Sequence, residues 1–224
     1  MSAALSPEVI ARAALNSNGF KPSHNLGQNF LLRQELLEEL LSGIEFSGET
    51  QVLEIGPGAG VMTALLETRA TRVIAVELDR RLKPVLDAVL HDHPKAEVLY
   101  QDILKMDIDA LVRERFHGVE YIVIANLPYY ITTEVLETLV SLASPPEAIC
   151  IMVQKEAAER ILSCVGSKQW CHLGAVTALY GDGAVLANVP RTCFEPQPNV
   201  DSVFLSIKKH TVPVATPIDD DLYC

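Results

Sequence analysis

The 224-residue sequence lacks the marks of membrane, secreted and disulfide-bonded proteins. No apolar run reaches the roughly 20 residues that a membrane-spanning helix needs. Residues 1–15 contain one basic residue and no continuous apolar segment, so they do not resemble a signal peptide. The five cysteines are odd in number and irregularly spaced, which indicates reduced thiols rather than a disulfide framework. These absences favour a cytoplasmic protein without a membrane partner.

A recognisable metal-binding pattern is also missing. Cys164, Cys171 and His172 lie close together in the sequence, but the chain contains no CxxC pair. Closely spaced pairs of this kind are typical of structural zinc sites. We therefore expect no bound metal.

Positive charge is scarce, which is unusual for a protein that binds nucleic acid. The chain has 18 basic and 29 acidic residues and a net charge of −11. The distribution is uneven, because residues 9–34 contain Arg12, Lys21 and Arg33 but no acidic residue. Charge alone therefore predicts a small basic N-terminal arm, extended into solvent, ahead of an acidic body.

Strand and helix patterns alternate along the chain, which predicts a parallel sheet with helices on both faces. Strands are expected at residues 51–55, 72–77, 97–100, 121–125, 148–153, 184–189 and 202–208. Helices are expected at residues 34–42, 60–67, 79–91, 108–115, 132–142, 154–162 and 170–180. The last two strands follow each other across a proline-rich loop, so we predict an antiparallel hairpin at the edge of a mostly parallel seven-stranded sheet.

The pattern divides the chain at about residue 209. Residues 1–209 are expected to form one α/β domain with its N-terminal arm. Residues 210–218 have the composition of a linker, and the acidic run Asp219–Asp221 resembles the first turn of a new helix. Residues 210–224 are therefore predicted to be a linker and the truncated start of a C-terminal helical domain.

The most informative motif is Asn126-Leu127-Pro128-Tyr129, directly after the expected strand at 121–125. Open α/β sheets bind ligands at the carboxyl ends of their strands. The Asn126 amide oxygen and the Leu127 carbonyl can accept hydrogen bonds from an exocyclic amine, and Tyr129 offers a flat face for a base. Pro128 fixes the backbone and brings no competing donor. This combination suits methyl transfer to the amino group of a base.

Three other strand ends favour an adenosine cofactor without phosphates. Gly56-Pro57-Gly58-Ala59-Gly60 follows the first strand, and glycines there let the backbone approach a ligand closely. Glu77 ends the second strand and can accept the ribose hydroxyls, while Asp102 follows the third and can accept from an adenine amine. S-adenosylmethionine fits this set. A NAD-dependent dehydrogenase is the alternative, but it calls for GxGxxG and a placed catalytic base.

In the order of its motifs the chain resembles the small-subunit ribosomal RNA adenine N6-dimethyltransferases, the kasugamycin-sensitivity methyltransferase family, from about residue 20 to 209. The motifs that carry the resemblance are Gly27-Gln28-Asn29-Phe30-Leu31, Glu54-Ile55-Gly56-Pro57-Gly58, Val76-Glu77-Leu78-Asp79, Gln101-Asp102, Asn126-Leu127-Pro128-Tyr129, Val153-Gln154-Lys155-Glu156 with Arg160, and residues 194–202. The resemblance implies a Rossmann-like class I methyltransferase fold.

It also implies an activity, namely dimethylation of adenosine N6 in small-subunit (16S-type) ribosomal RNA with S-adenosylmethionine, during ribosome biogenesis. The residues expected to contact the cofactor by this resemblance are Asn29, Leu31, Gly56, Glu77, Asp102 and Asn126. Tyr129 and Phe194 would stack on the flipped adenine, and Asn126 and the Leu127 carbonyl would hold its amine. Lys155 and Arg160 would contact RNA phosphates. Immature small ribosomal subunits are the expected partner, and a monomer is expected.

Two further hypotheses remain open at this point. The large-subunit adenine methyltransferases that confer macrolide resistance share the core motifs, although Leu127 and residues 194–202 are more similar to the small-subunit group. A non-catalytic RNA- or ribosome-binding module that keeps the fold is the other. It is motivated by the acidic charge, by the single lysine ahead of Gly27 and by the lack of a basic helical domain after residue 209.

Overall fold

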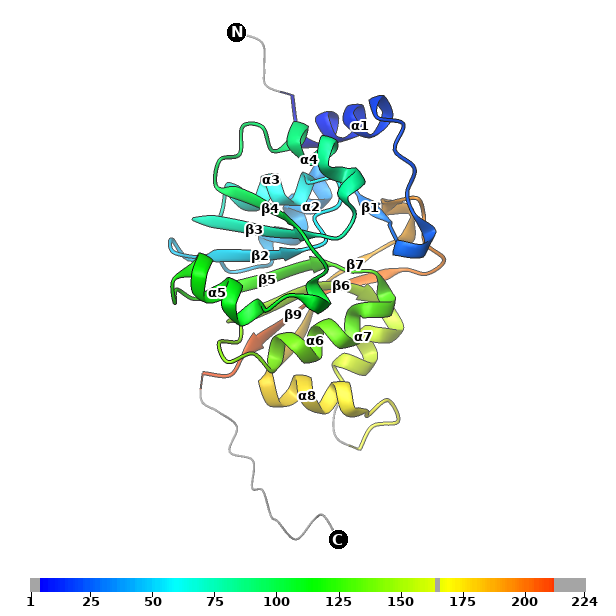
Figure 1. The fold of residues 1–224 in the computed structure, drawn as a ribbon. Helices are drawn as coiled ribbons and strands as arrows, with labels where there is room; N and C mark the ends of the chain where they lie inside the picture. The colour runs from blue at the N-terminus through cyan, green and yellow to red at the C-terminus, as the bar shows by residue number, and fades with distance from the viewer. Residues whose placement is uncertain (1–4, 164–165, 212–224) are drawn as a thin grey trace.

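The computed structural model describes residues 5–163 and 166–211, and the statements below concern these residues. A seven-stranded sheet has the order β4-β3-β2-β5-β6-β9-β7, and β1 pairs with β8 in a separate small sheet (Figure 1). The strands are β1 (Phe30–Leu31), β2 (Gln51–Ile55), β3 (Arg72–Glu77), β4 (Ala96–Tyr100), β5 (Tyr121–Asn126), β6 (Ala148–Gln154), β7 (Gly181–Val189), β8 (Phe194–Glu195) and β9 (Ser202–Lys209).

Eight α-helices connect the strands, with several short 3₁₀ turns between them. The α-helices are α1 (Pro7–Ser17), α2 (Gln34–Ser42), α3 (Val61–Glu67), α4 (Lys83–Val89), α5 (Ile108–Phe116), α6 (Thr132–Val140), α7 (Lys155–Ile161) and α8 (His172–Tyr180). The 3₁₀ turns are η1 (His24–Leu26), η2 (Arg80–Leu82), η3 (Ile103–Lys105), η4 (Tyr129–Ile131) and η5 (Arg191–Cys193).

The predicted sheet is confirmed. Strands β4, β3, β2, β5 and β6 are parallel, and β9 runs antiparallel between β6 and β7. The chain moves outward from β2 to β4 and then returns to the other side of β2 with β5. A reversal of this kind leaves a crevice at the carboxyl ends of the two central strands, where α/β proteins bind ligands.

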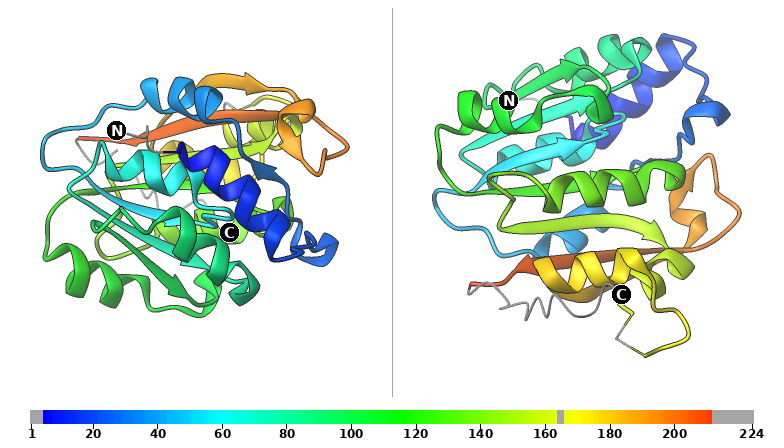
Figure 2. Two further views of the ribbon diagram at one scale, coloured as in Figure 1. Left: turned by 90° about the horizontal axis from the view of Figure 1, so that it is seen from above. Right: turned by 60° about the horizontal axis from the view of Figure 1, so that its bottom comes forward.

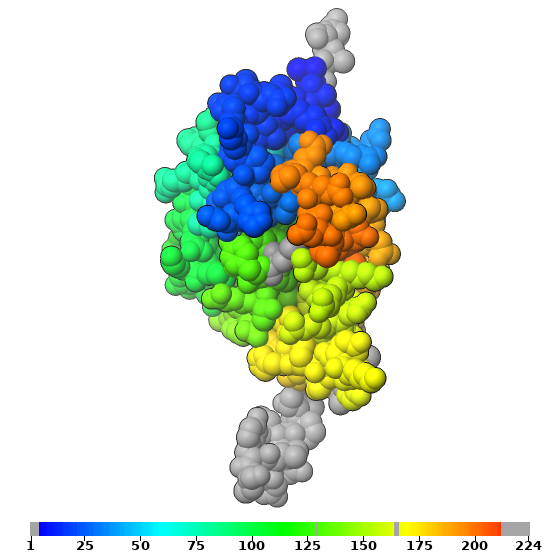
Figure 3. All heavy atoms as spheres, turned by 90° about the vertical axis from the view of Figure 1, so that its right-hand side faces the viewer, coloured from blue at the N-terminus to red at the C-terminus, as the bar shows by residue number. Residues whose placement is uncertain are grey.

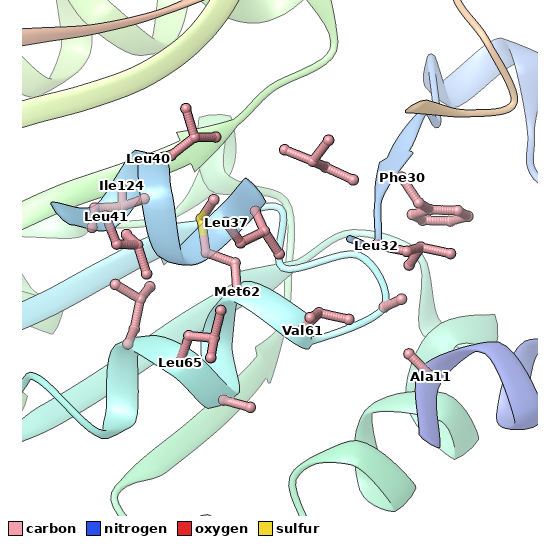
Figure 4. Packing of buried hydrophobic residues seen from close by; sticks show 14 of the residues in the cluster. Ala11, Phe30, Leu32, Leu37, Leu40, Leu41, Val61, Met62, Leu65 and Ile124 are labelled. Carbon is pink, nitrogen blue, oxygen red and sulfur yellow. The ribbon is translucent and has the colours of Figure 1, made fainter. Parts of the chain in front are cut away.

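Helices cover both faces of the sheet, and each covered face has its own apolar core (Figure 2). On one face α2 and α3 pack against the central strands. Figure 4 shows Leu37 of α2 and Met62 of α3 next to each other, with Ile124 of β5 behind α2. Helices α5 to α8 supply the apolar residues of the other core. Side chains alternate between these faces along each strand, so both cores depend on the same strand register.

The prediction of a solvated N-terminal arm is wrong. Residues 7–17 form α1, which begins with Ser6 as the cap and packs against α3 and α4. Ala11 is fully buried and Ala14 is 8 % exposed, because small side chains three residues apart let the helix approach its neighbours closely. Arg12 is held by ion pairs to Glu8 and Glu195 rather than free in solvent. The predicted linker and helix start at residues 212–224 lie outside the described residues.

Candidate active site

A cavity of about 220 Å³ opens at the carboxyl ends of β2, β3 and β5. Its walls come from the glycine loop after β2, the ends of β3 and β5, the turn after β4, and residues 26–31 of the N-terminal segment. Six of the residues predicted to contact a cofactor line this one cavity. They are Asn29, Leu31, Gly56, Glu77, Asp102 and Asn126.

The glycine loop between β2 and α3 has left-handed backbone at three positions. The φ angles are +73° at Gly56, +56° at Gly58 and +81° at Gly60, a region that other residues adopt only with strain. A Cβ on Gly58 would lie 3.0 Å from the Phe30 ring, and one on Gly56 would lie 3.5 Å from the Asn126 main-chain oxygen. The loop therefore needs glycine for its conformation at all three positions, and at Gly58 also for its close contact with Phe30.

Glu77, at the end of β3, holds this loop in place. Its Oε2 accepts a hydrogen bond from the Gly58 amide at 3.1 Å, and its Oε1 accepts one from the Asp79 amide at 2.8 Å. The side chain is almost fully buried, and this burial raises the pKa of Glu77 above its ordinary value in spite of the two bonds. A carboxylate fixed in this way can still accept bonds from a ligand, since each oxygen has two acceptor positions.

Asp102 is both the cap of a turn and a residue of the cavity wall. Its Oδ1 accepts a hydrogen bond from the Leu104 amide at 3.1 Å and so begins η3. Lys105 pairs with its Oδ2 at 3.3 Å. Asp102 also lines the cavity, next to Gln101 and Ile103. The cap therefore fixes the Asp102 carboxylate at the end of the cavity that lies next to β3 and β4.

Asn126 ends β5 at the inner wall of the cavity. Its Nδ2 donates a long hydrogen bond of 3.5 Å to the main-chain oxygen of Asn29. Leu127 is buried, and Pro128 begins the 3₁₀ turn η4, in which the Pro128 oxygen accepts from the Ile131 amide at 3.2 Å. All three predicted residues therefore border the cavity in a fixed backbone conformation. The Tyr129 backbone belongs to η4, but its side chain lies outside the described part of the structure.

Phe194 has a different environment from the one predicted. Its side chain is 3 % exposed, packs in an apolar core and does not line the cavity. The residue pairs with Leu31 in the small β1–β8 sheet, so the N-terminal segment covers it. Figure 3 shows the blue N-terminal segment and the orange segment around β8 side by side on one face. In this conformation the ring is part of the packing, and its stacking on a base stays a prediction.

The segment from Ser23 to Leu31, called here the covering segment, is fastened over the cavity by Gln28. The Gln28 Oε1 accepts from the Ser23 amide at 2.7 Å, and its Nε2 donates to Asp79 Oδ2 at 2.8 Å. Asp79 is itself held by Arg81 in a 2.6 Å ion pair. Gln28 lines the cavity but was not predicted as a site residue, because a single glutamine in a loop carries no spacing signal.

Other wall residues were also missed, namely Leu78, Ile103 and Tyr130. Leu78 and Ile103 directly follow the two predicted acids, so their position after a strand-end carboxylate was an available signal. Leu78 is half exposed although it is apolar. Paired apolar walls beside Glu77 and Asp102 suit a flat ring better than water.

Glu54 is buried beside the glycine loop without lining the cavity. It is 2 % exposed, and its Oε2 has no hydrogen-bond partner among the described residues. Burial raises the pKa of Glu54 to about 8, and the nearby Glu77 carboxylate acts in the same direction. The carboxyl is thus mostly protonated at neutral pH, which makes its burial tolerable.

A second, shallower cavity of about 500 Å³ lies at the end of β6. Lys155 and Arg191 border it together with Asn199 and acidic residues of α7. Arg191 donates to the Asn199 oxygen at 3.2 Å, which fixes its guanidinium at the rim. Lys155 is exposed at the first position of α7. Both cavities therefore lie at the edge of the sheet where the parallel strands have their carboxyl ends.

No group of three or more His, Cys, Asp or Glu side chains within 5–163 and 166–211 has an arrangement that could hold a metal ion. Cys150, Cys171 and Cys193 are free thiols, whereas Cys164 and Cys224 lie outside these ranges. In the same ranges no helix has the length and apolar character needed to cross a bilayer.

Comparison with known sequences decides the family. A sequence model described as ribosomal RNA adenine dimethylase matches residues 19–223, which is most of the chain. The chain belongs to this family. The ribosomal RNA small subunit methyltransferase A of Geobacillus thermodenitrificans is 37 % identical over 217 residues, which are 96 % of this chain and 72 % of that protein. The protein of the same name from Ligilactobacillus salivarius is 41 % identical over 219 residues, 96 % of this chain and 74 % of that protein.

Solved structures of family relatives have the same fold. A dimethyladenosine transferase from Plasmodium falciparum aligns with a TM-score of 0.69 at 28 % identity, over 80 % of this chain and 62 % of that chain. The 23S rRNA methyltransferase ErmE aligns with a TM-score of 0.71 at 26 % identity, over 83 % of this chain and 71 % of that chain. The Rossmann-like methyltransferase fold is therefore confirmed. The fold is common to a dimethyladenosine transferase and a 23S rRNA methyltransferase, whereas the two relatives by sequence given above carry the small-subunit name.

Proposed function

We propose that this member of the ribosomal RNA adenine dimethylase family uses S-adenosylmethionine to dimethylate adenosine N6 in small-subunit ribosomal RNA. The observation that carries the proposal is that one cavity joins the glycine loop, Glu77 and Asp102 to Asn126 and Leu127. The first group suits an adenosine cofactor, and the second suits an exocyclic amine. Small-subunit names among the relatives favour this substrate over large-subunit RNA.

The residues present fit S-adenosylmethionine. Gly56 and Gly58 line the cavity and carry no side chain, so a ligand can approach the loop backbone there. Glu77 would accept the ribose hydroxyls, Asp102 would accept from the adenine amine, and Leu78 and Ile103 would flank the ring. The cavity contains carboxylates and no pyrophosphate-binding GxGxxG loop, so it favours a cation over a dinucleotide.

When bound, the cofactor supplies an electrophilic methyl group on a positively charged sulfur. The protein's part is to position the amine, which is a poor nucleophile because its lone pair is conjugated with the purine. Asn126 Oδ1 and the Leu127 carbonyl would each accept one N–H of the target amine. Two acceptors draw the lone pair out of conjugation and aim it across the cavity. The donor bond from Asn126 Nδ2 to Asn29 keeps Oδ1 as the acceptor end.

The target adenosine must leave its stack to reach Asn126, because an enzyme cannot reach the target atom of a base inside a duplex. The monomethylated product keeps one N–H, so a second transfer can follow at the same acceptors. Neither round needs a general base from the protein, since the amine loses its proton easily once it is alkylated. Lys155 and Arg191, which line the second cavity, and the exposed Arg160 of α7 would contact the phosphates of the RNA.

The test is incubation of the chain with tritiated S-adenosylmethionine and immature small ribosomal subunits that lack the modification. We expect label in N6,N6-dimethyladenosine of the small-subunit RNA. Label in large-subunit RNA alone would favour the macrolide-resistance type of enzyme. In calorimetry, tight binding of S-adenosylmethionine would disfavour a non-catalytic RNA-binding module, whereas no binding would disfavour the enzyme. That the protein is a monomer stays a prediction, which sedimentation would test. That it is cytoplasmic also stays a prediction, which cell fractionation would test.

A further inference from the structure

Tyr130 is unusual among the aromatic residues of this chain. Its side chain is 63 % exposed, whereas each of the other aromatic side chains that the structure describes is buried or half-buried. An exposed aromatic ring beside a cavity offers a flat face on which a base can stack. Tyr130 also lines the main cavity, unlike the exposed Val119, Leu179 and Val185.

Neighbouring residues fix the position of the Tyr130 ring. It belongs to η4, whose backbone is fixed at one end by Pro128 and closed by the bond from the Ile131 amide to the Pro128 oxygen. A Cβ on Gly27 would lie 3.8 Å from Tyr130 Cε1 and 3.1 Å from Pro128 Cβ. The edge of the ring therefore rests beside the Gly27 backbone, which has no side chain, and the rest of the ring remains open.

We propose that Tyr130 is a stacking surface for the base that adjoins the target adenosine in the RNA chain. The proposal rests on the proposed function. The target amine must reach Asn126, which is half-buried, whereas the Tyr130 ring beside the same cavity is 63 % exposed. A base on Tyr130 is thus the next one along the strand. Flipping the target out of its stack leaves that neighbour without a stacking partner, and an aromatic ring replaces the lost contact.

The charge of the chain makes such a contact important. Phosphate neutralisation normally dominates the affinity of proteins for nucleic acid. Here the net charge is −11, and the second cavity places Glu156, Glu159 and Asp201 beside Lys155 and Arg191. Affinity for RNA near the active site must therefore come in part from uncharged contacts. Stacking on an aromatic ring supplies this and tolerates any base, because every base has a flat face.

The experiment compares Tyr130→Ala and Tyr130→Phe with the parent chain, using immature small ribosomal subunits and tritiated S-adenosylmethionine. Leu179→Ala, which removes another exposed apolar side chain from α8, is the matched control. We expect Tyr130→Ala to raise the KM for subunits about tenfold, as the loss of one base–aromatic contact does. Tyr130→Phe keeps the ring and should stay within about twofold of the parent, as should Leu179→Ala. The dissociation constant for S-adenosylmethionine should change in none of them.

Four other outcomes are informative. A parent chain that labels no adenosine would overturn the proposed function and the stacking role with it. A labelling parent with an unchanged KM in Tyr130→Ala would overturn the stacking role alone. Loss of activity in both Tyr130→Ala and Tyr130→Phe would mean that the hydroxyl matters rather than the ring. A raised dissociation constant for the cofactor would assign Tyr130 to the cofactor and likewise contradict the stacking role.

Discussion

Asn126 Nδ2 donates to the main-chain oxygen of Asn29 over 3.5 Å, and this bond joins the end of β5 to the covering segment. The two residues are 97 positions apart in the sequence. The bond has a chemical consequence. Because the side-chain nitrogen of Asn126 faces Asn29, its side-chain oxygen faces away from Asn29. The covering segment thus helps to orient the acceptor that we assign to the target amine.

Replacement of Asn126 by alanine should remove most of the methyl transfer. Loss of one positioned hydrogen-bonding group at an active site typically lowers kcat by about 100-fold or more. The fold should persist, because Asn126 is only half-buried at the end of its strand. Single-turnover transfer to immature subunits measures the effect, with the exposed Asn188→Ala as control. Activity of Asn126→Ala within a few-fold of the parent would contradict the assigned role.

Replacement of Gly58 by alanine should weaken cofactor binding. A left-handed conformation costs a non-glycine residue about 1–2 kcal/mol, and the added Cβ would lie 3.0 Å from the Phe30 ring. Phe30 adjoins both Asn29 and Leu31, so its displacement disturbs the covering segment. Calorimetry with S-adenosylmethionine measures the change. Gly48→Ala is the matched control, because a Cβ there meets nothing within 4 Å; equal affinities for the two variants would contradict the prediction.

Replacement of Glu77 by alanine should weaken cofactor binding by about 1.5–3 kcal/mol, the range for hydrogen bonds to a charged group. The variant also leaves the Gly58 and Asp79 amides without their acceptor. Glu77→Gln keeps one acceptor oxygen and should fall between parent and alanine variant. The exposed Glu120→Ala serves as control in the same titrations. A dissociation constant unchanged in Glu77→Ala would remove this residue from the site.

Much of the fold follows from hydrophobic patterning. Five short segments rich in apolar residues, each followed by a helical pattern, predict the parallel strands to within about one residue, because buried parallel strands are largely apolar on both faces. Helix α1 was missed, although Ser6-Pro7 is a common helix start and Ala11 and Ala14 share one face. Its packing surface consists of alanines, which carry a weak periodic signal.

The site was predictable where a strand end defines it. Glu77, Asp102 and Asn126 each terminate or follow a parallel strand, and parallel strand ends converge at one edge. The covering segment was less predictable, because β1 and β8 have two residues each and pair across more than 160 positions. No pattern along the chain reveals that pairing, and for this reason the burial of Phe194 was not foreseen.

Glu54 should make stability depend on pH. Burial raises its pKa from 4.5 to about 8. Below pH 4.5 the carboxyl is protonated in both the folded and the unfolded chain. Between about pH 4.5 and 8 only the unfolded chain loses the proton, so the free energy of unfolding falls by up to about 1.4 kcal/mol per pH unit. Above pH 8 both states are ionised and this contribution becomes constant.

Glu54→Gln removes this titration and keeps the side-chain shape. The free energy of unfolding of the variant minus that of the parent should increase steadily from pH 5 to pH 8, because only the parent loses stability over this range. Urea denaturation at several pH values measures this difference. Glu120→Gln, at an exposed position, should show a constant difference. A constant difference for Glu54→Gln as well would mean that the carboxyl is ionised in the folded protein.

Lys155 should contribute to RNA affinity without affecting the cofactor. It is exposed at the end of β6, beside the second cavity. A lysine that neutralises one phosphate of single-stranded RNA adds about 0.7 to the slope of log K against log salt. Lys155→Gln should lower affinity for immature subunits and reduce that slope by about this amount. Lys208 lies at the opposite end of the sheet, paired with Glu45, so Lys208→Gln should change neither. Equal slopes for parent and Lys155→Gln would show that this lysine meets no phosphate.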